Sequence, residues 1–189
     1  MRGHSGAFVV AGGVVIVGLV TAAFTSFEVV WPWMMAGGVA IAAGLFSLAS
    51  RLEGEAGRGV GHAGRVLACV AGAGAFIYVA VTVSFLAAGA LGVALPAPLE
   101  GLFGIGALGF LAHVIVASML LGGTAVRRGS GTRGAGLLLL ASGLLFLSPF
   151  PVLFGLDVPE SMPPIAVALL AIVQLLVGYA LRASQLGHS

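Results

Sequence analysis

GLFGIGALGFLAHVIVASMLLGGTAV, residues 101–126, contains no charged residue and lies between Glu100 on one side and Arg127 and Arg128 on the other. The hydrocarbon core of a bilayer is about 30 Å thick, so a helix that crosses it needs roughly 20 apolar residues. The stretch therefore predicts a transmembrane helix. Its histidine, His113, lies about halfway along, where an imidazole needs an explanation.

The rest of the 189-residue chain has the same character, with 60% hydrophobic and 7% charged residues. A soluble domain normally carries about 25% charged residues. Uncharged runs of spanning size occur six times, at residues 7–26, 33–50, 66–94, 101–126, 135–152 and 163–181. We therefore predict an all-α integral membrane protein whose residues 1–189 form one domain with six transmembrane helices. The third run is long for a single span, which predicts that it tilts or projects beyond the hydrocarbon.

The segments between these runs alternate in charge. All arginines fall on one side of a six-span topology: Arg2, Arg51, Arg58, Arg65, Arg127, Arg128, Arg133 and Arg182. The opposite segments hold Glu28, Glu100, Asp157 and Glu160 and no basic residue. Short Arg-rich loops stay in the cytoplasm, which predicts a multi-pass protein of the cell membrane with both termini cytoplasmic and three hairpins that turn outside.

The arginines of the two inner loops, Arg51, Arg58, Arg65, Arg127, Arg128 and Arg133, are predicted to contact anionic lipid headgroups on the cytoplasmic side. An alternative concerns the first run, which could be a cleaved secretory signal because Arg2 precedes an apolar core and small residues follow at 21–23. The length of that apolar run favours a retained helix.

Small residues recur at four-residue spacing in several runs. Ala80, Ser84, Ala88 and Gly92 share one face of the third run, and the fourth contains Gly101, Gly104, Gly106 and Gly109. Membrane helices approach one another through such residues. These faces are predicted to serve helix contacts within one protomer or between protomers in a homo-oligomer.

His113 lies on the small-residue face of its run, because its neighbours four residues away are Gly109 and Ala117. Counting along each run places a few other polar side chains at a similar depth, namely Tyr78, Thr82, Ser142 and Gln174. Two interpretations stay open for this midplane polar layer. The histidine either forms a structural hydrogen bond across a helix contact, or the layer lines a polar pathway.

Enzyme activity finds no positive support, and we predict no catalytic, cofactor-binding or metal-binding residue. The chain contains no Lys, which excludes a retinal Schiff base, and its single cysteine, Cys69, excludes an internal disulfide. A bis-histidine haem needs a second intramembrane histidine, whereas His4, His62 and His188 lie in the tails or a loop. Eight scattered arginines do not form a nucleic-acid-binding stripe.

Two functions fit this pattern. The first is a small accessory, stress-related or assembly protein that acts through membrane partners, and the second is a channel or facilitator for a small neutral solute, with the polar layer around His113 as its constriction. The six-span, three-hairpin layout, with GLFSLASR closing the second run, resembles acid-resistance membrane proteins of the HdeD type. The resemblance covers layout rather than motif and implies no site residues.

Overall fold

The computed structural model describes residues 3–26, 29–56, 58–94, 96, 98–128, 133–148 and 162–186. These residues form six helices and the turns beside them. The helices are α1 (Gly3–Phe24), α2 (Val30–Ala56), α3 (Arg58–Leu91), α4 (Pro98–Arg128), α5 (Arg133–Leu145) and α7 (Met162–Leu186). The all-helical class predicted from the sequence is confirmed.

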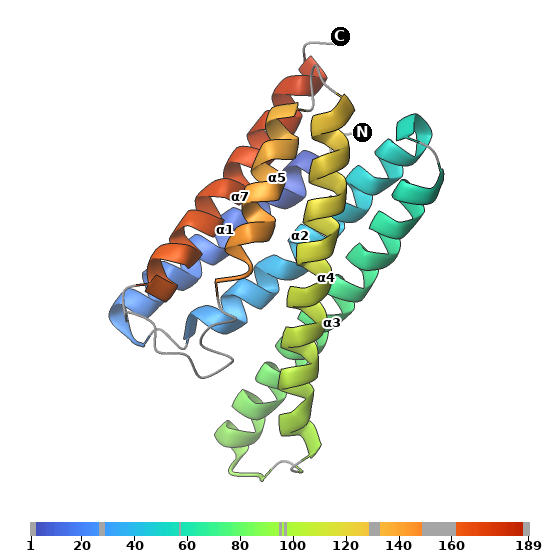
Figure 1. Cartoon of the computed structure of the whole chain (residues 1–189). Helices are drawn as coiled ribbons and strands as arrows, with labels where there is room; N and C mark the ends of the chain where they lie inside the picture. Colours follow the sequence, from blue (N-terminus) through green and yellow to red (C-terminus); the bar gives the residue numbers. More distant parts are fainter. Residues whose placement is uncertain are drawn as a thin grey trace.

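The helices pack in chain order into a closed ring. Each helix contacts the next one along the chain, α7 contacts α1 to close the ring, and α2 also contacts α4 across it. Figure 1 shows both termini at the end of the bundle where α2 turns into α3 and where α4 ends. The arginine-bearing helix ends therefore gather at one end of the molecule.

Five helices contain a segment that is long and apolar enough to cross a membrane, within α1, α2, α3, α4 and α7. The fifth helix is shorter than the predicted span 135–152, since α5 has 13 residues and ends at Leu145. At 1.5 Å per residue, α5 is about 20 Å long, less than a bilayer core. Residues 146–148 continue as a turn, and Pro149 follows, which disfavours helical backbone at the residue before it. Residues 149–161 lie outside the described residues.

Four of the eight prolines lie in the first turns of helices. Pro32 is the third residue of α2, Pro98 is the first residue of α4, and Pro163 and Pro164 follow Met162 in α7. The first-turn amides have no partner within the helix, so a proline, which has no N–H, costs no hydrogen bond there. Helices α2, α4 and α7 therefore begin at or just before these prolines.

The predicted Gly-rich inner loop 51–65 is largely helical. Helix α2 continues to Ala56 and α3 begins at Arg58. Gly61 and Gly64 make this close connection feasible, because a Cβ on Gly61 would meet Glu53 and Ala49 of α2, and one on Gly64 would meet Ala49 and also Leu121 of α4. Tertiary packing outweighs the low helix propensity of glycine here. His62, predicted in a loop, is an exposed residue of α3.

Glycines bring the backbones of neighbouring helices into contact. A Cβ on Gly74 of α3 would lie 2.8 Å from the carbonyl oxygen of Gly106 of α4, and one on Gly106 would lie 2.9 Å from that of Gly74. Gly122 of α4 and Gly136 of α5 form the same reciprocal contact, each 2.8 Å from the other's carbonyl oxygen. Close backbone approach of this kind drives helix association in lipid.

The α3–α4 hairpin extends past the ends of the other helices, at the end opposite the termini (Figure 1). Its turn begins at Gly92, whose φ of 66° is the left-handed conformation that glycine adopts readily. The amide of Val93 donates to the carbonyl of Ala88 at 2.9 Å, which completes a helix C-cap. The prediction that the third run tilts or projects beyond the hydrocarbon concerns the bilayer and stays a prediction.

Candidate functional site

The structure joins two members of the predicted polar layer, Ser142 of α5 and Gln174 of α7. The amide Nε2 of Gln174 donates to Ser142 Oγ at 2.6 Å. Both side chains are fully buried, at 0% exposure. Gln174 shares its helix face with the buried Ala171 and with Gly178, which packs against α1. This hydrogen bond links the short α5 to α7.

His113 of α4 turns back onto its own helix. Its Nδ1–H donates to the carbonyl of Gly109, four residues earlier, at 2.7 Å. This bond requires a proton on Nδ1, because a carbonyl oxygen only accepts. The ring is half-buried, beside a core-facing stripe that includes Phe110, Val114 and Ala117. The bond to its own helix is compatible with a structural histidine.

Tyr78 and Thr82 lie on α3, away from the Ser142–Gln174 pair. The ring of Tyr78 packs edge-on against Phe103 of α4, with centroids 5.1 Å apart. The hydroxyl of Thr82 donates to the carbonyl of Tyr78 at 2.9 Å, which satisfies it within its own helix. The Tyr78 ring therefore belongs to the α3–α4 contact, whereas the Thr82 hydroxyl bonds within α3.

The polar residues of the predicted layer lie at different levels along α4. A Cβ on Gly106 would lie 3.0 Å from the amide nitrogen of Tyr78, which sets the level of Tyr78. His113 follows Gly106 by seven residues, about 10 Å along the axis. A Cβ on Gly143, next to Ser142, would lie 3.4 Å from Ser118 Cβ, and Ser118 follows His113 by five residues, about 7 Å further. The residues predicted to share one depth are therefore staggered.

Large apolar side chains fill the space between the helices. The rings of Phe110 of α4 and Phe146 meet edge to face, with centroids 5.5 Å apart. A Cβ on Gly38 of α2 would lie 2.7 Å from the ring of Phe110, which shows how tightly this ring is held. Phe8 and Met35 are also fully buried. The centre of the ring of helices is thus a packed apolar core.

Ser118 is a buried polar residue that the sequence reasoning did not place in the layer. It is 1% exposed, and its hydroxyl has no hydrogen-bond partner among the described residues. The same holds for Oε1 of Gln174. Ser118 is next to Ala117, which faces the core, and this position in the sequence could have indicated that the Ser118 side chain points inward.

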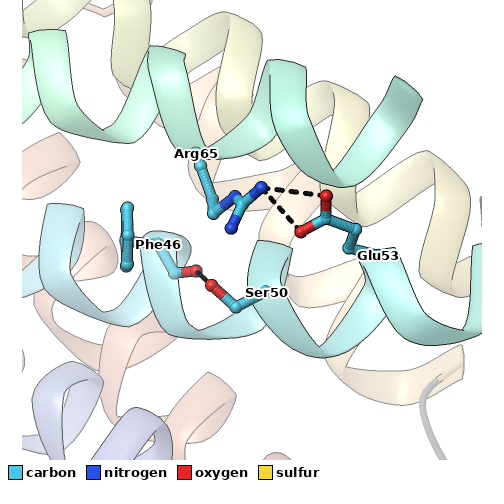
Figure 2. A network of polar contacts seen from close by, with 4 residues as sticks. All are labelled: Phe46, Ser50, Glu53 and Arg65. Atoms are coloured by element: carbon cyan, nitrogen blue, oxygen red, sulfur yellow. Dashed lines mark hydrogen bonds and ion pairs between the residues drawn. The ribbon is translucent and has the colours of Figure 1, made fainter. Parts of the chain in front are cut away.

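One of the predicted headgroup arginines forms an ion pair. Figure 2 shows Arg65 of α3 pointing at Glu53 of α2, with its Nη2 at 2.9 Å from Oε1 and 2.7 Å from Oε2. The side chains are 32% and 25% exposed, so the pair is partly shielded from solvent. Arg127, Arg128 and Arg133 are exposed at the same end, and Arg51 is partly exposed. The side chain of Arg58 lies outside the described residues, and the headgroup contacts stay a prediction.

No protein-family model, curated protein or solved structure matches the chain. Among the described residues, no three His, Cys, Asp or Glu side chains are grouped as a metal site would need. The arrangement of the side chains therefore carries the functional argument alone.

Proposed function

We propose that this protein is a non-catalytic, multi-pass protein of the cell membrane that acts by binding another membrane protein. The packed core supports this proposal, because Phe110, Phe146, Phe8 and Met35 occupy the place that a solute pathway or reaction chamber would need. The polar residues predicted to line such a pathway lie at different levels along α4, and only Ser142 and Gln174 among these described residues are joined by a hydrogen bond between side chains, so no contact supports the facilitator function.

The projecting end of the α3–α4 hairpin is the proposed partner surface. Leu86 and Leu91 of α3 are 70% and 77% exposed, and Ile105 of α4 is 62% exposed. The apolar segment of α3 has 33 residues, against 20 in α1, so α3 is about 20 Å longer. A bilayer that matches α1 leaves part of this apolar hairpin without lipid unless the hairpin tilts. A partner that covers it removes that cost.

The orientation belongs to the same proposal. Exposed Arg127, Arg128, Arg133 and Arg182 lie at the end of the bundle that holds both termini. We place this end in the cytoplasm by the positive-inside rule. The α3–α4 turn then projects on the outer side, and the partner contacts the outer half of the hairpin.

Photo-crosslinking in intact membranes tests the partner. A photoreactive residue replaces Leu86 or Ile105 on the hairpin, and control variants carry it at Val10 or Ile172, which are exposed on the shorter α1 and α7. We expect one defined protein adduct, identified by mass spectrometry, from the hairpin positions alone. An adduct with a second copy of this chain would identify the partner as the chain itself. Lipid adducts alone from all positions would contradict the proposal.

A further inference from the structure

Three buried polar side chains lie on α4, α5 and α7, and α5 contacts both of the other two helices. Ser118, Ser142 and Gln174 come from the three different helices, and none is more than 1% exposed. Ser142 Oγ accepts the hydrogen bond from Gln174, and Ser118 Cβ abuts the position of Gly143, next to Ser142. The three residues are called the α4–α5–α7 polar junction below.

Two atoms of this junction lack a partner among the described residues, Ser118 Oγ and Gln174 Oε1. A buried polar atom without a hydrogen bond costs free energy, and in lipid no surrounding water can supply the bond. Such atoms in a packed interior commonly mark a bound water molecule. One donor–acceptor hydroxyl and one amide oxygen give such a molecule the two or more partners it needs.

The conformation of Ser118 is unusual for a hydroxyl in this protein. Several other hydroxyls in the helices, and that of Thr25 just after α1, donate to the carbonyl four residues earlier; the helical ones are those of Thr21, Ser50, Thr82, Ser84 and Thr124. That bond satisfies a hydroxyl without any external partner. Ser118 does not make it. Its hydroxyl is thus available to a molecule held between the helices.

We propose that the α4–α5–α7 polar junction is a binding site for one water molecule, which donates to Gln174 Oε1 and accepts from the hydroxyl of Ser118. The water extends the Gln174–Ser142 hydrogen bond into a network that includes α4. This network holds the short α5 against both of its neighbours. The site is independent of the proposed partner surface, which lies at the far end of the hairpin.

The composition of the chain allows a direct test by NMR. The sequence contains no Asn and only two glutamines, Gln174 and Gln185, so ¹⁵N-glutamine labelling gives two side-chain amide signals. The variant Gln174→Leu assigns them. Magnetisation transfer from water to the Gln174 amide protons is then measured in detergent micelles. In the rotating frame, a cross-peak from a bound water has the opposite sign to one from chemical exchange of the amide protons, so the sign distinguishes the two.

We expect a bound-water cross-peak at Gln174 that falls by at least half in Ser118→Ala. The matched control is Ser84→Ala, because the hydroxyl of Ser84 is satisfied by the carbonyl of Ala80, and this variant should keep the cross-peak. Ser118→Cys, which preserves volume and donates weakly, replaces Ser118→Ala if the latter fails to fold. A missing cross-peak in the unmodified protein would overturn the proposal. A cross-peak that Ser118 variants leave unchanged would also overturn it, because the water would then bind Gln174 alone.

Discussion

The contact between Gly74 of α3 and Gly106 of α4 allows a quantitative prediction about stability. A Cβ on Gly74 would lie 2.5 Å from the amide nitrogen of Phe110 and 2.8 Å from the carbonyl oxygen of Gly106, whereas ordinary contacts begin at 3.4 Å. Both of these atoms belong to the backbone, so no side chain can rotate away. Alanine at this position must therefore push the two helices apart.

Overpacking of this kind lowers the free energy of unfolding by about 1–3 kcal/mol. We expect Gly74→Ala at the upper end of this range, because every atom close to the added Cβ belongs to the backbone. A Cβ on Gly106 would lie 2.9 Å from the carbonyl oxygen of Gly74, which is less severe, so Gly106→Ala belongs in the lower half. Each kcal/mol shifts the Tm of a chain of this size by about 2–4 °C. We expect Gly74→Ala to lower Tm by roughly 6–12 °C and Gly106→Ala by roughly 2–8 °C.

The chain offers a matched control on each helix. Gly89 of α3 and Gly104 of α4 have no heavy atom within 4 Å of the added Cβ. Alanine there gains helix propensity, worth at most about 1 kcal/mol, without a clash. All four variants are compared in one detergent by thermal unfolding at a fixed scan rate, because membrane proteins often unfold irreversibly. Equal Tm changes for Gly74→Ala and Gly89→Ala would refute the reasoning that backbone contact holds α3 to α4.

Three further changes test other contacts. Glu53→Gln removes the partner of Arg65 and should lower Tm by no more than about 4 °C, because a partly exposed pair contributes at most about 1 kcal/mol; the loss should shrink in high salt, measured by unfolding at two ionic strengths. Gly92→Ala forces a side chain into a positive φ of 66° and should cost roughly 1–2 kcal/mol in the same assay. Ser142→Ala removes the acceptor of the Gln174 amide and should cost at least the roughly 0.6 kcal/mol typical of an interhelical hydrogen bond; an unchanged Tm would contradict that role.

The positions of the helices were predictable because an uncharged run of sufficient length has few alternatives in a chain this apolar. The helix ends were less predictable. The prolines at 32 and 98 suggested loops and instead lie in first helical turns. The Gly-rich segment 51–65 suggested a loop and is mostly helical, because Gly61 and Gly64 pack against α2. The second difference arises from contacts between helices, which local sequence does not contain, whereas the first follows from the unpaired amides of a first helical turn.

The pairing of small residues was not predictable, because Gly and Ala occur on every face of these helices. The ladder of the third run does not act as one packing face: Ala80 and Ser84 are exposed, Ala88 is buried, and Gly92 caps the helix. The tight contact uses Gly74 instead. The abundance of Gly and Ala indicates that the helices can approach closely. Where they do so depends on the register of the two helices, which the composition does not determine.

The polar layer was predicted by counting to the middle of each run, which assumes that all runs are centred in the bilayer. The projecting α3–α4 hairpin breaks this assumption. Tyr78 is level with Gly106, about 10 Å along α4 from His113. Ser142 and Gln174 do meet, because α5 and α7 do not share this displacement. The structure therefore brings Ser142 and Gln174 together and separates Tyr78 from His113 along the neighbouring helices α3 and α4.

The helix interfaces differ in the kind of contact that holds them, and the contact between α5 and α7 relies on a polar one. Glycines of α1, α2, α3 and α4 approach a neighbouring backbone at the α1–α7, α1–α2, α2–α3, α3–α4 and α4–α5 contacts. At the α5–α7 contact the structure places the Gln174–Ser142 hydrogen bond. The hydrophobic effect does not drive helices together in lipid. A helix of 13 residues also forms fewer van der Waals contacts with its neighbours than a longer helix does. A directional bond, strengthened by a water that Ser118 shares, therefore closes the ring where close backbone packing does not.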